Sequence, residues 1–277
     1  MVYQSPWQHS RSAGVADDID FEIKGQELQF LEVELDPGES AVAEAGALVW
    51  KDASVEMTTV FGDGSGGQGG GFMGKLLGAG KRLVTGESLF TTVFTHQGRG
   101  KARVAFASPT PGSILPIKLD RVGGTLICQK DSFLAAAKGV TIGVQFQRRM
   151  MTGLFGGEGF VMQRLDGDGW VFVQMGGTVV ERELRPGEQL HVDTGCLAAL
   201  TPSVEFDLVA AGGVKSMFFG GEGLFFARLT GPGTVWIQSL PFSRLAARMF
   251  AAAGPRGGGN RGEGSVLGGL GDLLDGN

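Results

Sequence analysis

Cysteine is scarce in this sequence: Cys128 and Cys196 are the only two among 277 residues. They form no Cys-x-x-Cys pair, and no histidine lies at zinc-ligand spacing from either one. The pattern therefore argues against a disulfide framework and a structural zinc site. Each cysteine lies in an apolar run, which predicts a small buried side chain in a reducing compartment.

Long apolar runs are missing too. No stretch approaches the ~18 apolar residues that a membrane-spanning helix needs. The polar segment 1–18 lacks the apolar region of a signal peptide. We therefore expect a cytoplasmic protein.

Positive charge is not in excess, because the formal net charge is −5 at pH 7. A general nucleic-acid binder needs a basic surface that displaces counterions from the phosphates. The charge balance therefore predicts that DNA is not a partner and argues against RNA, although a local basic patch would not show in the total.

The residue patterns of common active sites are absent as well. Ser132, Ser203 and Ser216 lie in no Gly-x-Ser-x-Gly sequence, and no cluster of Asp, Glu and His has metal-ligand spacing along the chain. The segment 69–76 resembles a phosphate-binding loop, but Leu76 stands where such a loop needs Ser or Thr to hold magnesium. We expect no enzyme activity, no cofactor and no metal site.

Glycine, by contrast, is abundant at 49 residues, and it marks a repeat. The sequence Phe-Gly-Gly-Glu-Gly occurs at 155–159 and again 64 positions later at 219–223. The same offset aligns Gln174 with Gln238, and a weaker Gly-Glu copy before an apolar run lies at 85–90. A constant offset of this kind indicates a diverged internal repeat.

A Pro-Gly turn recurs upstream of these motifs. Leu35–Glu39 resembles Leu184–Glu188, and Thr110–Ser113 is interpreted as the middle copy. Proline presets φ and glycine accepts a positive φ in a type II turn. The alternating sequence that follows, for example Gln189–Asp193, has the period of two that is typical of a β-strand.

The repeat predicts an all-β fold of three tandem β-sandwich or double-stranded β-helix modules with a short C-terminal helix. Apolar residues at 242, 245, 246, 249 and 250 fit one face of that helix, which we expect to pack on the sheets. The expected organisation is a flexible tail at 1–18, module 1 at 19–108 with a Gly-rich insertion at 62–80, module 2 at 109–180, module 3 with the closing helix at 181–250, and a Gly-rich disordered tail at 251–277.

These motifs, taken in order, resemble a known family. Gly86–Phe90, Phe155–Gly159, Leu184–Glu188 and Phe219–Gly223 look like the "altered inheritance of mitochondria" (AIM) proteins and their bacterial relatives, and the resemblance covers roughly Phe21–Phe250. It implies a fold like that of the tryptophan RNA-binding attenuation protein, with three β-modules per chain and often a trimer of chains. It brings no catalytic residues. Mitochondrial members are linked to inner-membrane organisation, but this chain lacks an Arg/Ser-rich transit peptide, so that role does not transfer directly.

One segment, 72–84, mixes apolar and basic residues. That composition suits contact with an anionic membrane surface or with a partner groove, and the alternative is a loop tucked against its own protein or a trimer contact. The candidate contact residues are Phe72, Met73, Lys75, Leu76, Leu77, Lys81 and Arg82.

Three carboxylates recur at equivalent places of the repeat, Glu87, Glu158 and Glu222. They could form a ring site in a threefold array, or each could accept hydrogen bonds from backbone N–H groups at its glycine turn. We favour the second role, because it is one structural task performed three times.

Together these observations favour a non-enzymatic, self-assembling β-module protein that acts as a scaffold or interaction partner, with a homotrimer as the favoured assembly. Two alternatives stay open. One is a peripheral membrane-associating protein that uses the segment 72–84. The other is a module that binds a small ligand or RNA in clefts between modules, which rests on the fold resemblance alone.

Overall fold

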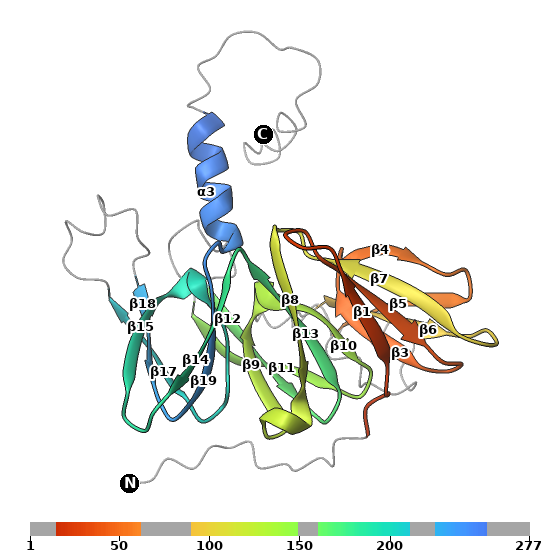
Figure 1. Ribbon diagram of the computed structural model, residues 1–277, viewed down its shortest axis with the longest axis horizontal. Helices are drawn as coiled ribbons and strands as arrows, with labels where there is room; N and C mark the ends of the chain where they lie inside the picture. Colours follow the sequence, from red (N-terminus) through yellow and green to blue (C-terminus); the bar gives the residue numbers. More distant parts are fainter. Residues whose placement is uncertain (1–14, 62–89, 149–159, 211–224, 254–277) are drawn as a thin grey trace, which may run out of the picture.

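The computed structural model describes residues 15–61, 90–148, 160–210 and 225–253. In these ranges the chain forms β-strands in four antiparallel sheets and one α-helix, α3 (Phe242–Ala253) (Figure 1). The predicted β class and the short C-terminal helix are confirmed.

The two inner sheets, B and C, have six strands each. Sheet B runs in the order β5 (Val55–Phe61), β6 (Phe90–His96), β3 (Ser40–Glu44), β10 (Phe133–Ala137), β13 (Trp170–Gly176), β8 (Gly112–Lys118). Sheet C runs in the order β11 (Thr141–Arg148), β12 (Phe160–Asp166), β9 (Thr125–Gln129), β16 (Leu197–Leu200), β19 (Gly233–Gln238), β14 (Val179–Leu184).

The two outer sheets, A and D, are smaller and lie at opposite ends of the molecule (Figure 1). Sheet A runs in the order β1 (Asp20–Lys24), β2 (Phe30–Leu35), β7 (Ala102–Ala107), β4 (Leu48–Lys51). Sheet D runs in the order β15 (Gln189–Asp193), β18 (Phe225–Thr230), β17 (Glu205–Ala210).

The strand connections recur along the chain. We call β2–β7 group 1, β8–β13 group 2 and β14–β19 group 3. Within each group the first, sixth and third strands are neighbours in one sheet, and the second, fifth and fourth are neighbours in the next. Sheet B therefore joins strands of groups 1 and 2 at the β3·β10 pair, and sheet C joins groups 2 and 3 at the β9·β16 pair.

Three hydrophobic clusters lie between successive sheets. The alternation of side chains along a strand lets sheet B serve two of them. On β13, Phe172 belongs to the cluster between sheets A and B, whereas Val171 and Val173 belong to the cluster between sheets B and C. Burial on both faces explains why β10 is apolar throughout, with the sequence Phe-Leu-Ala-Ala-Ala.

The Pro-Gly turns are found in two of the three groups. Gly38 and Gly187, with φ of 90° and 77°, lie in the turns that join β2 to β3 and β14 to β15. The middle copy predicted at Thr110–Ser113 is wrong, because Gly112 begins β8 instead. The β8–β9 connection is a 3₁₀ turn, η1 (Leu119–Val122), so a Pro-Gly pair alone does not fix its place in the strand order.

The helix α3 exists as predicted, but its packing on the sheets was predicted wrongly. Phe242, Met249 and Phe250 are 56, 65 and 70% exposed. The helix rises away from the strands (Figure 1) and contacts the short 3₁₀ turn η4 (Thr194–Cys196). An amphipathic period reveals an apolar face but not which surface covers it.

Several predictions concern residues outside the described ranges: the tail before residue 15, the Gly-rich insertion at 62–80 and the tail beyond residue 253. In the part of the chain that is described, no helix has the length and apolar character needed to cross a membrane.

Candidate functional site

The sequence-predicted contact residues all lie outside the described ranges: Phe72, Met73, Lys75, Leu76, Leu77, Lys81 and Arg82. The same holds for Glu87, Glu158 and Glu222 and for the segment 69–76. The candidate sites of the described ranges consist of other residues.

The cysteines and histidines of the described strands have structural surroundings. Cys128 and Cys196 are buried and neither is part of a disulfide, and burial raises the pKa of the Cys128 thiol to about 12. His96 is buried at the end of β6, where Nε2 lies 3.0 Å from the Gly100 carbonyl oxygen. Across the described ranges no three His, Cys, Asp or Glu side chains are grouped so that they could hold a metal ion.

An apolar strand edge is the first candidate site. β4 is the outermost strand of sheet A, and Leu48, Val49 and Trp50 on it are 36, 53 and 37% exposed. Single exposed apolar side chains are ordinary on a protein surface, but three in a row on an edge strand are not. This edge is the kind of surface to which another strand can add.

β4 has counterparts in the other two groups, because β4, β10 and β16 share one irregularity. Each pairs with its neighbour through a register shift after its first residue, at Leu48/Trp50, Phe133/Ala135 and Leu197/Ala199. The shared bulge aligns the three strands residue by residue. Val49 therefore corresponds to Leu134 and Ala198, and Trp50 corresponds to Ala135 and Ala199.

The counterparts of β4 are covered where β4 is not. Leu134 and Ala135 belong to the cluster between sheets A and B, which is the core of the preceding group, and both are fully buried. Ala198 and Ala199 likewise belong to the cluster between sheets B and C. Val49 and Trp50 thus point to where a preceding group would lie.

A second unpaired edge lies at the other end of the molecule, on β15 of sheet D (Figure 1). Its counterparts are β3 and β9, because all three pair with the fifth strand of their group. β3 and β9 pair with β10 and β16, the counterparts of β4. The free edges of β15 and β4 are therefore the two halves of a strand junction that occurs twice within the chain.

Both internal junctions have the same register. Ala135 pairs with Ala43 at the first, and Ala199 pairs with Cys128 at the second. Ala43 and Cys128 occupy the same place as Val192 on β15, since all three are fourth in their strand. The register therefore predicts Trp50 opposite Val192, and Lys51 opposite His191.

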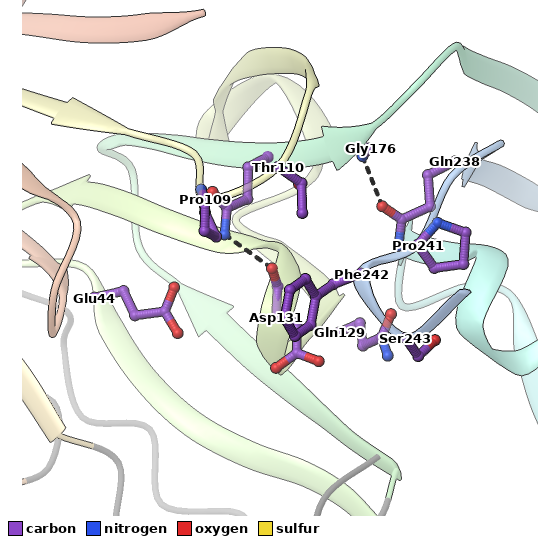
Figure 2. Close-up of a pocket in the computed structure, with 11 residues that line it drawn as sticks. Glu44, Pro109, Thr110, Gln129, Asp131, Gly176, Gln238, Pro241, Phe242 and Ser243 are labelled. Atoms are coloured by element: carbon purple, nitrogen blue, oxygen red, sulfur yellow. Dashed lines mark hydrogen bonds between the residues drawn. The ribbon is translucent and has the colours of Figure 1, made fainter. Parts of the chain in front are cut away.

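A pocket of about 200 Å³ is the second candidate site (Figure 2). It lies where the ends of strands from all three groups meet the start of α3. Its lining is formed by Glu44, Pro109, Thr110, Gln129, Asp131, Gln174, Gly176, Gln238, Pro241, Phe242 and Ser243.

Two glutamines in this pocket are counterparts, as the repeat offset predicted. Gln174 Nε2 donates to the Asp131 carbonyl at 2.9 Å, and Gln238 Nε2 donates to the Gly195 carbonyl at 3.0 Å. Gln238 Oε1 also accepts from the Gly176 N–H at 2.8 Å (Figure 2). Gln174 Oε1 has no such partner among the described residues, although its side chain is buried.

Three polar residues occupy one position at the ends of β3, β9 and β15: Glu44, Gln129 and Asp193. Asp193 uses Oδ1 to accept from the Gly195 N–H at 2.9 Å. Gln129 Oε1 is buried and has no partner among the described residues. The same backbone position thus carries three different polar groups, and two of them line the pocket.

Glu44 has the most perturbed carboxyl group of the site. Burial raises its pKa from 4.5 to about 7, and the neighbouring charge of Asp131 acts in the same direction. The ammonium group of Lys130 opposes this shift. The carboxyl therefore changes charge near neutral pH.

Sequence reasoning missed both candidate sites except for Gln174 and Gln238. A signal for the β4 edge was present in the sequence, because Leu-Val-Trp at 48–50 is apolar like its counterpart Phe-Leu-Ala at 133–135. Seeing it required the alignment of the two bulges, which only the strand pairing shows.

Comparison with known proteins identifies related chains. The model of the family described as "Mitochondrial biogenesis AIM24" matches residues 21–240. An uncharacterised protein of Streptococcus pyogenes serotype M6 is 28% identical over 253 residues, which cover 90% of this chain and 96% of that protein. The crystal structure of a Streptococcus pyogenes protein superposes with a TM-score of 0.67 at 23% identity, covering 84% of this chain and 99% of the other, and this likeness concerns the fold alone.

Proposed function

This chain belongs to the mitochondrial biogenesis AIM24 family, as its motifs indicated, and on that premise we propose that it is a non-enzymatic protein that assembles with copies of itself through the β4 and β15 edges. The proposal treats the three strand groups as copies of one module, at 19–108, 109–180 and 181–250, similar to the tryptophan RNA-binding attenuation protein. The assembly is the scaffold on which other partners are bound.

One observation carries this proposal: the β4 edge is exposed and apolar where its two counterparts are buried in a strand junction. In the assembly, β15 of one chain pairs with β4 of the next, so that sheets D and A become one six-stranded sheet. Val49 and Trp50 then enter the hydrophobic cluster between sheets C and D of the neighbouring chain, as Leu134 and Ala135 enter that of group 1.

The two edges lie at opposite ends of one chain (Figure 1), so the contact joins two different chains head to tail. A head-to-tail contact gives a closed ring when the rotation per chain closes. We favour a ring of three chains, in which nine strand groups follow one another.

The first experiment measures the mass of the full-length protein by size-exclusion chromatography with multi-angle light scattering. A trimer has three times the chain mass of 29.0 kDa. A monomer at all concentrations tested would overturn the proposal.

A second experiment tests the register. We expect chains with Lys51→Cys and chains with His191→Cys to form a disulfide-linked dimer when they are mixed and oxidised, because opposite residues of an antiparallel pair have Cα atoms close enough for a disulfide. Neither variant alone should cross-link. The matched control replaces His191→Cys by Glu205→Cys, which lies on β17 at the far edge of the same sheet. Equal cross-linking in the control would contradict the predicted junction.

A membrane surface is the second candidate partner, and the exposed face of α3 favours it. Phe242, Met249 and Phe250 are exposed beside Arg248, a combination that suits the interface of an anionic bilayer. The segment 72–84 has a similar composition. The test is flotation of the full-length chain with anionic vesicles, with Phe250→Glu as the variant that should lose binding. No flotation of the wild-type chain at low salt would remove this candidate.

A further inference from the structure

The pocket in Figure 2 contains two buried acceptors whose hydrogen-bonding capacity is unused. Gln129 and Gln174 are 5 and 4% exposed, and the Oε1 atom of each has no partner among the described residues. Buried carbonyl oxygens are nearly always paired in folded proteins, so two of them in one pocket require an explanation.

Comparison with the counterpart Gln238 explains why Gln174 Oε1 has no partner. Gln238 Oε1 accepts from the N–H of Gly176, which is three residues beyond Val173 on β13. Pro109 lies three residues beyond Phe106, the counterpart of Val173, and therefore occupies the equivalent place for Gln174. Proline has no N–H, so this position cannot satisfy the amide. The Nε2 bond to the Asp131 carbonyl fixes which end of the Gln174 amide is the oxygen.

The charged groups around Glu44 in this pocket are mostly negative. Glu44 and Asp131 contribute carboxylates to the lining, and the influence of Asp131 on the Glu44 pKa shows that the two are near each other. Lys130, which precedes Asp131 in the chain, is the cation that acts on the Glu44 carboxyl group. Two amide oxygens and two carboxylates are all acceptors, so the group that suits them is a donor with positive charge.

The remaining walls fit a short aliphatic chain. Pro109, Pro241 and the ring of Phe242 line the pocket, and Phe242 is more than half exposed, so its ring is accessible from the opening. The volume of about 200 Å³ is below that of a typical pocket for drug-sized molecules.

We propose that this pocket binds a small aliphatic compound with a primary ammonium group, which donates to Gln174 and Glu44. The start of α3 lies across the pocket from Glu44 (Figure 2), and the positive end of a helix dipole disfavours a cation. The ammonium group therefore lies at the Glu44 side and the alkyl chain at the Phe242 side.

Binding should depend on pH in a defined direction. A protonated Glu44 carboxyl is neutral and attracts an ammonium group less than the carboxylate does. Asp131 and Lys130 also act on Glu44, and the Cys128 thiol, whose pKa burial raises to about 12, stays neutral between pH 6 and 8. Affinity should therefore rise from pH 6 to pH 8.

The experiment is isothermal titration calorimetry of the full-length protein with butan-1-amine. We expect one molecule bound per chain at pH 8 and about tenfold weaker binding at pH 6, because a group with a pKa of about 7 is mostly ionised at the first pH and mostly protonated at the second. Butan-1-ol has the same chain length without the ammonium group and should not bind.

Two variants separate Glu44 from the rest of the surface. Glu44→Gln keeps the side-chain size and should weaken binding at pH 8 and abolish the pH dependence. Glu205→Gln removes an exposed carboxylate on β17 and should bind like the wild type. No binding of the amine by the folded wild-type chain, equal binding of the alcohol, or an unchanged titration of Glu44→Gln would each overturn the proposal. One chain supplies the whole lining, so the result is independent of self-assembly.

Discussion

β4 and β10 have the same place in their groups and the same bulge, but their surroundings are opposite. Leu134 on β10 is fully buried, whereas its counterpart Val49 on β4 is 53% exposed. The difference comes from the neighbour: β10 pairs with β3 of the preceding group, whereas no strand among the described residues pairs with the free edge of β4. Burial at these positions is therefore set by what precedes the group, not by the strand's own sequence.

The largest loss of stability is expected at the internal junction of β3 and β10. Leu134→Asp places a carboxylate in the cluster between sheets A and B. We expect a loss of about 4 kcal/mol or more in the free energy of unfolding, because a buried charge without a partner is among the costliest substitutions. Urea unfolding followed by circular dichroism measures it. A stable folded Leu134→Asp chain would show that this junction is looser than the structure has it.

The second comparison is between Glu44, which lines the pocket, and its counterpart Asp193, which does not. It concerns the dependence of stability on pH. The folded-state pKa of Glu44 is raised above its unfolded value, so the folded protein holds the proton more tightly between pH 4.5 and about 7. The contribution of this group to the free energy of unfolding is therefore greatest below pH 4.5 and falls by about 3 kcal/mol as the pH rises to 7. Glu44→Gln should remove this fall, so that the variant gains stability over the wild type at pH 8. A constant difference between the two proteins from pH 4.5 to 8 would contradict the raised pKa.

The third comparison is between Gln238 and Gln174. Gln238→Leu leaves the Gly176 N–H and the Gly195 carbonyl without their partner, whereas Gln174→Leu affects only the Asp131 carbonyl. Each buried unpaired group costs about 1–3 kcal/mol. We expect Gln238→Leu to lower the free energy of unfolding by about 1 kcal/mol more than Gln174→Leu does. Equal losses in parallel thermal unfolding would mean that the two glutamines do not differ in the way described.

The smallest effect on stability is expected at the exposed counterpart of Leu134. Val49→Asp should change the free energy of unfolding of a single chain by less than about 0.5 kcal/mol, because its side chain faces solvent. The same change should abolish self-assembly, measured by light scattering, because it places a charge in the proposed junction. The matched control is Met57→Asp on β5, which is also 53% exposed and lies outside that junction. A Val49→Asp chain that assembles like the wild type would rule out the β4 edge.

The sequence predicted the β class, the C-terminal helix and the family, because turn motifs and alternating strands are local signals. It placed the Pro-Gly turns of groups 1 and 3 in register but not that of group 2, where the η1 turn replaces it. The sequence did not predict the candidate sites. The free acceptor of Gln174 depends on Pro109, and the exposure of Trp50 depends on the edge of β4, with which no described strand pairs. Both depend on how segments far apart in the chain are placed.

The sharing of sheets between consecutive groups has a consequence for how the protein comes apart. Phe172 and Val173 are adjacent on one strand, yet they contribute to two different cores. Removing group 1 would strip one face of sheet B and expose side chains of group 2, so the boundary between groups is a plane through a continuous core and not a linker. We therefore expect that a cut between two groups, as the described strands join them, releases no independently stable piece, and that the three groups persist or are lost together.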